Sequence, residues 1–92
     1  MNVAIHEKRQ EVRQPAEGPI LVHFSDPQPM EIVGELVDMS PSGFRMSHAN
    51  QSLQSGQVVE FSHPYAVGVA RVMWNRILDR RVETGFRIVD SK

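Results

Sequence analysis

Two arginines near the N-terminus, Arg9 and Arg13, are four residues apart, and Lys8 precedes the first of them. Residues four apart share one face of a helix, and an even spacing puts both side chains on one side of a strand. Guanidinium groups combine a rigid fork of donors for phosphate oxygens with a flat face for stacking. The pair can therefore converge on one anionic ligand, with Lys8 adding a third positive charge. The alternative is a solvated charged tail in which Glu7 and Glu11 form weak surface ion pairs.

A second polar motif, Asp38-Met-Ser-Pro-Ser-Gly43, follows an apolar run. An ionised carboxylate only accepts hydrogen bonds, so Asp38 can pair with the two N–H donors on the edge of a guanine. Ser40 can donate or accept, and Gly43 leaves room for a ring or phosphate beside the backbone. Residues 40–43 also fit a type I turn. The alternative is a plain connection between strands, in which Asp38 and Ser40 bond to local N–H groups.

Short runs rich in β-branched and aromatic residues, separated by turn residues, must position these motifs. We expect strands at 20–24, 31–37, 44–46, 58–61, 65–74 and 81–89, a polar loop at 75–81, and at most one helical turn at 51–56. Strands at this spacing are typical of an all-β barrel or sandwich. Gly34 predicts a bulge or a close approach of two strands. By default the large aromatic residues belong to the core: Phe44, Phe61, Trp74 and Phe86.

Composition narrows the classes of function. The chain has 92 residues and no cysteine, which predicts one domain without disulfides or thiolate metal sites. The net charge of −1 argues against broad attraction to nucleic acid or anionic membranes. There is no apolar run of about 20 residues and no signal-peptide pattern at the N-terminus, so we expect a cytoplasmic protein.

The four histidines, His6, His23, His48 and His63, match no metal-ligand spacing, and we expect no metal site. His23 and His63 are expected at the surface or half-buried. No serine lies in a nucleophile elbow, and no glycine-rich phosphate loop is present, so we do not expect an enzyme.

The two polar motifs, in this order on a β-rich background, resemble the PilZ domain family of bacterial cyclic di-GMP receptors. That family carries RxxxR in an N-terminal arm and [D/N]xSxxG on the barrel, here Arg9 to Arg13 and Asp38 to Gly43. The stretches 70–74 and 85–89 are similar to the closing pair of strands of the family. The resemblance thus covers about residues 7–90.

This resemblance implies a six-stranded antiparallel β-barrel at residues 20–90, preceded by an N-terminal arm at 1–19. Our hypothesis is that the arm is flexible without ligand and folds onto the turn at 38–43 when ligand binds. We expect no long C-terminal helix. Arg9 and Arg13 would bind the phosphates and stack on guanine, while the second motif would read the base. The full set of expected ligand residues is Lys8, Arg9, Arg13, Asp38, Ser40, Gly43 and Trp74. Lys8 is at a position that influences whether one ligand or a stacked pair binds.

The implied function is non-catalytic: the domain binds cyclic di-GMP and passes the signal to an effector protein that controls motility, exopolysaccharide or biofilm formation. The protein would be a monomer or a ligand-dependent dimer, without DNA, RNA or membrane as partners. Two alternatives stay open, a protein adaptor without nucleotide binding and a small nucleic-acid-binding barrel. The C-terminal arginines mark either a partner surface or solvated strand faces: Arg71, Arg76, Arg80, Arg81 and Arg87.

Overall fold

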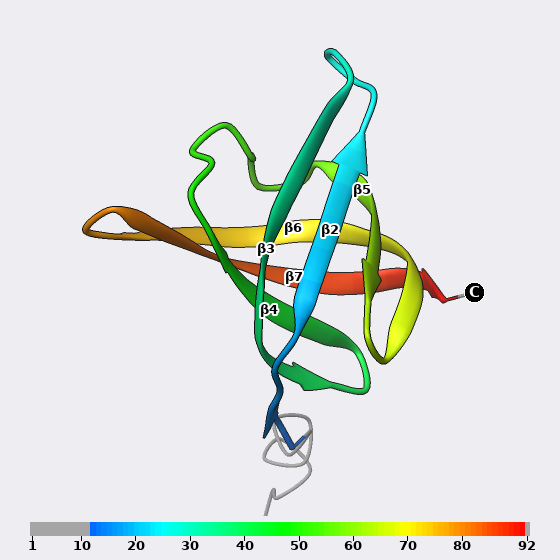
Figure 1. Cartoon of the computed structure of the whole chain (residues 1–92). Coiled ribbons are helices and arrows are strands. Elements are labelled where there is room, and N and C mark those ends of the chain that lie inside the picture. Colours follow the sequence, from blue (N-terminus) through cyan, green and yellow to red (C-terminus); the bar gives the residue numbers. More distant parts are fainter. Residues whose placement is uncertain (1–11, 92) are drawn as a thin grey trace, which may run out of the picture.

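A computed structural model of the chain describes residues 12–91. These residues form seven antiparallel strands and no helix (Figure 1). The strands are β1 (Gln14–Pro15), β2 (Pro19–Phe24), β3 (Met30–Ser40), β4 (Gly43–His48), β5 (Val58–His63), β6 (Ala66–Leu78) and β7 (Arg81–Ser91).

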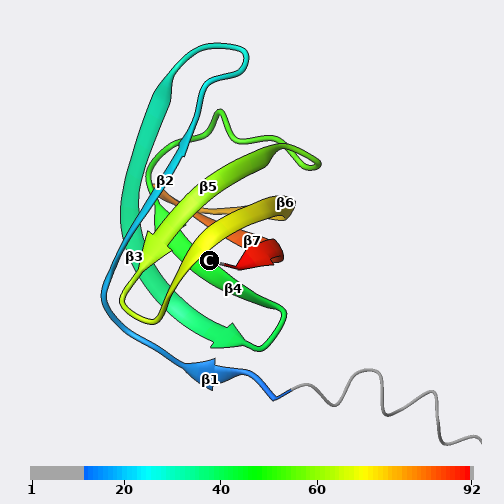
Figure 2. The same cartoon turned by 90° about the vertical axis from the view of Figure 1, so that its right-hand side faces the viewer.

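Six of these strands close into a barrel. Their order is β3-β2-β5-β6-β7-β4, and β4 pairs with β3 again to complete the ring. The short β1 adds to β3 as a seventh strand, where Pro15 lies opposite Asp38 (Figure 2). The prediction of a six-stranded antiparallel β-barrel is therefore confirmed. Residues 1–11 of the predicted arm lie outside the described residues, and within the remainder Gln14 and Pro15 pair with β3.

The core is filled by one side of each strand. In β5, Val59 and Phe61 are buried while their neighbours are exposed, as expected for a strand with one face toward an apolar interior. Three phenylalanines form its centre. The ring of Phe44 lies 4.7 Å from that of Phe61 and 4.8 Å from that of Phe86, between ring centroids. The core assignment of these three residues is confirmed.

The strand β6 is longer than predicted. It pairs with β7 as far as Leu78 opposite Arg81, so the predicted polar loop at 75–81 is wrong. Only Asp79 and Arg80 form the turn, and Asp79 has φ of 63°, a left-handed conformation that aspartate tolerates better than most residues. Figure 1 shows this end of β6 and β7 projecting beyond the barrel as a two-stranded ribbon.

Two glycines allow strands to approach each other closely. A Cβ atom at Gly34 would collide with the carbonyl oxygen of Ser47, which confirms the close approach predicted there. A Cβ atom at Gly43 would collide with the carbonyl oxygen of Phe86. The close neighbour of Gly43 in the structure is thus β7, and its expected contact with a ligand stays a prediction.

Two histidines belong to the interior. His63 is almost fully buried against Phe44, so the expected surface or half-buried position is wrong for this residue. His48 is completely buried and takes part in a chain of hydrogen bonds. Its Nδ1 accepts from the backbone N–H of Asn50 at 3.1 Å, and its Nε2 lies 2.7 Å from Oγ1 of Thr84. Since Nδ1 accepts, Nε2 carries the proton, and the ring is the neutral tautomer.

Candidate functional site

The carboxylate of Asp38 is the centre of a cluster of arginines. Arg13 donates to Oδ1 from Nε at 3.2 Å and from Nη2 at 3.1 Å. Arg45 donates to Oδ2 from Nε at 2.9 Å and through a closer contact from Nη2. A carboxylate has about four lone-pair positions, so these four N–H groups fill its acceptor capacity. Asp38 itself is nearly buried.

The hairpin register explains how Asp38 meets Arg45. Ser40 lies opposite Gly43 across the two-residue turn of Pro41 and Ser42, and counting back along the ladder puts Asp38 opposite Arg45. An extra residue between Leu36 and Asp38 then shifts the register, so that Leu36 faces the core while Asp38 faces outward. The turn predicted at 40–43 is confirmed, and the strand before it extends to Ser40, beyond its predicted end at residue 37.

Arg45 is a site residue that the sequence analysis missed. The signal was present, since a two-residue turn at 41–42 fixes the register and places Arg45 across from Asp38. Glu83 lies beside the cluster, with its Oε1 3.5 Å from Nη1 of Arg45 and 2.8 Å from Nη2 of Arg76. Arg45 therefore has carboxylates on two sides, whereas Arg13 is paired with Asp38.

Electrostatics keep Asp38 ionised. Burial alone would raise the pKa of this carboxyl, but the hydrogen bonds from Arg45 and Arg13, together with their charges, bring its pKa below the usual value. In return, the hydrogen bond to Asp38 raises the pKa of Arg45. With Glu83 and Arg76 counted, three cations and two anions leave a net positive charge on this part of the barrel, which suits an anionic ligand.

The cross-strand row continues from Arg45 to Trp74. Arg45 is opposite Gly85 of β7, and Gly85 is opposite Trp74 of β6. A Cβ atom at Gly85 would collide with the indole, so the ring of Trp74 lies over this glycine. Trp74 is 38% exposed, and its default assignment to the core is therefore wrong. Together with Arg45, Asn75 and Arg76 it lines a shallow pocket of about 360 Å³.

The structure thus brings five of the predicted ligand residues into one region of the outer barrel surface: Arg13, Asp38, Ser40, Gly43 and Trp74. Lys8 and Arg9 lie outside the described residues. The motif residue Ser40 is buried at the end of β3. Arg45 connects the arginine cluster around Asp38 with the shallow pocket beside Trp74, since it donates to Asp38 and also lines that pocket.

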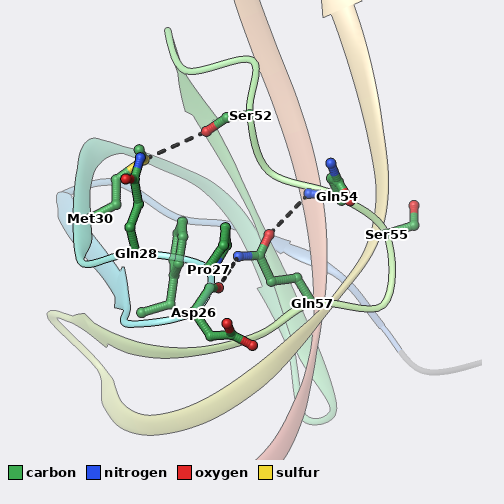
Figure 3. Close-up of a pocket in the computed structure, with 9 residues that line it drawn as sticks. Asp26, Pro27, Gln28, Met30, Ser52, Gln54, Ser55 and Gln57 are labelled. Carbon is green, nitrogen blue, oxygen red and sulfur yellow. Dashed lines mark hydrogen bonds between the residues drawn. The ribbon is translucent and has the colours of Figure 1, made fainter.

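A different pocket, of about 380 Å³, is found between the turn at 25–29 and the loop at 49–57 (Figure 3). It lies at the end of the barrel away from the β3–β4 hairpin. None of the nine described residues that line it is a cation, and Asp26 is ionisable. This pocket therefore lacks the positive charge that phosphate groups require.

Within residues 12–91 there is no cluster of acidic and histidine side chains that could hold a metal ion. The same stretch has no helix long and apolar enough to cross a membrane.

Comparison with known proteins agrees with this arrangement. A search of curated proteins finds no match for the chain. The family model for the PilZ domain matches residues 7–91, which is nearly the whole chain and includes both polar motifs. The chain therefore belongs to the PilZ domain family.

Proposed function

We propose that this chain is a non-catalytic cyclic di-GMP receptor that relays the presence of the messenger to an effector protein in the cytoplasm. The observation that carries the proposal is the pairing of Arg13 and Arg45 on Asp38, at the base of the hairpin that bears the DxSxxG motif. Family membership supplies the class of ligand. The net positive charge of the cluster and the exposed indole of Trp74 supply partners for phosphate and base.

Binding would proceed by exchange of hydrogen-bond partners. Because the acceptor positions of Asp38 are filled, its carboxylate can bond to a guanine edge only after one arginine leaves. Arg13 is the one we expect to leave. Its side chain is 44% exposed, against 30% for Arg45, and Arg45 is also near Glu83. The released Arg13 would join Arg9 on the phosphates of the ligand.

The relay would follow from the same exchange. Arg13 directly precedes β1, which is a two-residue strand paired only with β3 among the described residues. Movement of Arg13 would therefore change the surface around β1 without disturbing the barrel. The effector reads this surface and sets the output, which we place in motility, exopolysaccharide or biofilm control.

Isothermal titration of the full chain with cyclic di-GMP tests the proposal. Hydrogen bonds to charged groups contribute about 1.5–3 kcal/mol, and loss of the internal pair with Asp38 returns about 1 kcal/mol of this, so Arg13→Ala is expected to weaken binding by about two- to thirtyfold. The double variant Arg9→Ala, Arg13→Ala should abolish the heat of binding. Arg80→Ala is the matched control, because it removes one arginine at the tip of the ribbon and should bind like the original chain.

Absence of binding by the original chain, in titration and in competition with a fluorescent cyclic di-GMP, would refute the receptor and favour a protein adaptor. Equal affinity in all variants would refute the assigned site. Binding to oligonucleotides that weakens steeply with salt would favour the nucleic-acid alternative. The stoichiometry of the titration distinguishes one ligand from a stacked pair.

A further inference from the structure

The far half of β6 has an unpaired edge. β5 pairs with β6 only as far as Arg71, and the loop at 49–57 bonds to the backbone at Val72. From Asn75 to Leu78, β6 pairs with β7, and no other strand of residues 12–91 pairs with its opposite edge. Figure 1 shows this segment in the ribbon that projects from the barrel. An open edge presents N–H and C=O groups that can add another strand.

This edge is held in place by side-chain bonds at its base. Asn75 donates from Nδ2 to the carbonyl oxygen of Leu53 at 3.0 Å, and its Oδ1 accepts from Oγ1 of Thr84 at 2.6 Å. Further along, Arg76 and Glu83 form an ion pair of 2.8 Å across the two strands. The ribbon is therefore ordered before any partner arrives, which lowers the entropic cost of association.

Three of the five side chains along the edge are large, apolar and exposed: Trp74, Ile77 and Leu78. Because neighbours in a strand point to opposite faces, Trp74, Arg76 and Leu78 share one face, while Asn75 and Ile77 share the other. Ile77 is 60% exposed and Leu78 is 45% exposed. Strand addition uses this combination, in which the backbone gives affinity and alternate side chains give specificity.

We propose that the edge of β6 from Trp74 to Leu78 is a docking strand for an extended segment of a partner protein, with acidic residues on the face of Arg76 and apolar residues on the face of Ile77. Charge supports an acidic occupant. Arg45, Arg76 and Arg81 lie on this face with Asp38 and Glu83, so three cations face two anions.

A second copy of the chain is a poorer occupant of the same edge. Antiparallel pairing over the whole stretch from Trp74 to Leu78 would place Arg76 directly opposite Arg76 of the other copy. Like charges in directly opposite positions destabilise a sheet. The partner segment is therefore expected to come from a different protein.

The docked segment would belong to the effector of the proposed relay, which would contact this edge as well as the surface around β1, so the proposal rests on the proposed function. The docking edge includes Trp74, which also lines the shallow pocket of the candidate site, so a ligand on that pocket would border the docked strand. Peptide binding to this edge is measured on protein without nucleotide. The outcome is therefore separate from whether cyclic di-GMP binds.

The probe is a labelled nine-residue peptide that alternates valine and glutamate, and the comparison peptide carries lysine in place of glutamate. Fluorescence anisotropy is expected to show at least tenfold tighter binding of the glutamate peptide, with the largest backbone amide shifts at residues 74–78. Ile77→Thr and Arg76→Gln should each weaken binding at least fivefold. Val33→Thr is the matched control, since Val33 is 70% exposed on β3 and should leave binding unchanged.

Circular dichroism checks that each variant keeps the fold. Equal binding of the two peptides, or amide shifts away from 74–78, would overturn the proposal. Concentration-dependent dimerisation in sedimentation that Ile77→Thr abolishes would assign the edge to a second copy instead. Binding to anionic lipid vesicles that Arg76→Gln abolishes, without binding of the peptide, would assign it to a membrane surface.

Discussion

The pairing of Asp38 with Arg45 can be measured as a coupling energy in a double-mutant cycle of Asp38→Asn and Arg45→Gln. Two N–H groups of Arg45 bond to a carboxylate that is nearly buried. Hydrogen bonds to charged groups contribute about 1.5–3 kcal/mol, and partial exposure of Arg45 lowers this toward the values of surface pairs. We expect a coupling of about 1–2 kcal/mol at pH 7. The corresponding cycle with Arg13→Gln should give about 0.5–1 kcal/mol, because Arg13 is more exposed.

Urea unfolding followed by circular dichroism is the assay. For a domain of this size the m-value in urea is on the order of 1–2 kcal/mol/M, so a loss of about 1.5 kcal/mol lowers the midpoint by about 1 M. The coupling must also depend on pH. Since the pKa of Asp38 is lowered in the fold, the stabilisation is complete above the ordinary value of 3.8 and is lost as the pH falls through the lowered pKa.

Three results would contradict this reasoning. A coupling near zero at pH 7 would mean that the ion pair adds nothing to the free energy of unfolding, because solvation of the two separate groups is equally favourable. A coupling that is unchanged in strong acid would mean that Arg45 stabilises the fold by packing. A larger coupling for Arg13 than for Arg45 would reverse the assignment of Arg13 as the arginine that leaves Asp38.

Two further predictions concern single residues. Gly85→Ala should displace the indole of Trp74, with a stability loss of about 1–3 kcal/mol and a red shift of the emission of the sole tryptophan; unchanged emission would contradict the close packing. Burial and the charge of Arg81 lower the pKa of His48 below its ordinary value of 6.5. The neutral ring therefore stabilises the fold fully above about pH 6.5, and this stabilisation declines as the pH falls toward the lowered pKa. Urea midpoints between pH 7.5 and 5 should fall less steeply in His48→Gln than in the original chain or in the control His23→Gln, and identical slopes would refute this role.

The barrel could be predicted from local patterns, because strand composition and turn residues act over short distances. The same patterns failed where tertiary pairing overrode composition. Asn75 to Arg81 contains polar residues typical of a loop, yet pairing with β7 makes most of it a strand. The burial of His48 and His63 was equally hidden, since a hydrogen-bonded neutral imidazole is recognised only once its partners are placed.

The residue types of the two motifs were enough to predict candidate site residues, but not how these residues are arranged in space. Asp38 and Ser40 could be predicted because a carboxylate accepts hydrogen bonds and a hydroxyl group donates or accepts them. Arg45 did not, because a cation in a strand has no local signal and its role depends on the register opposite Asp38. Trp74 has the composition of a core residue, but an irregular register between Val72 and Trp74 turns its side chain outward, where the indole lies over Gly85.

Under the proposed function, the complete occupation of Asp38 would make Arg13 an intramolecular competitor of the ligand. Under the proposed exchange, an internal pair worth about 1 kcal/mol leaves roughly one molecule in six open to the ligand and raises the apparent Kd about sixfold. Substitutions that strengthen or weaken this pair would shift the messenger concentration at which the receptor fills, even where they touch no group that contacts the ligand. The detection threshold would then be an internal property of the domain, adjustable by mutation without redesign of the binding surface.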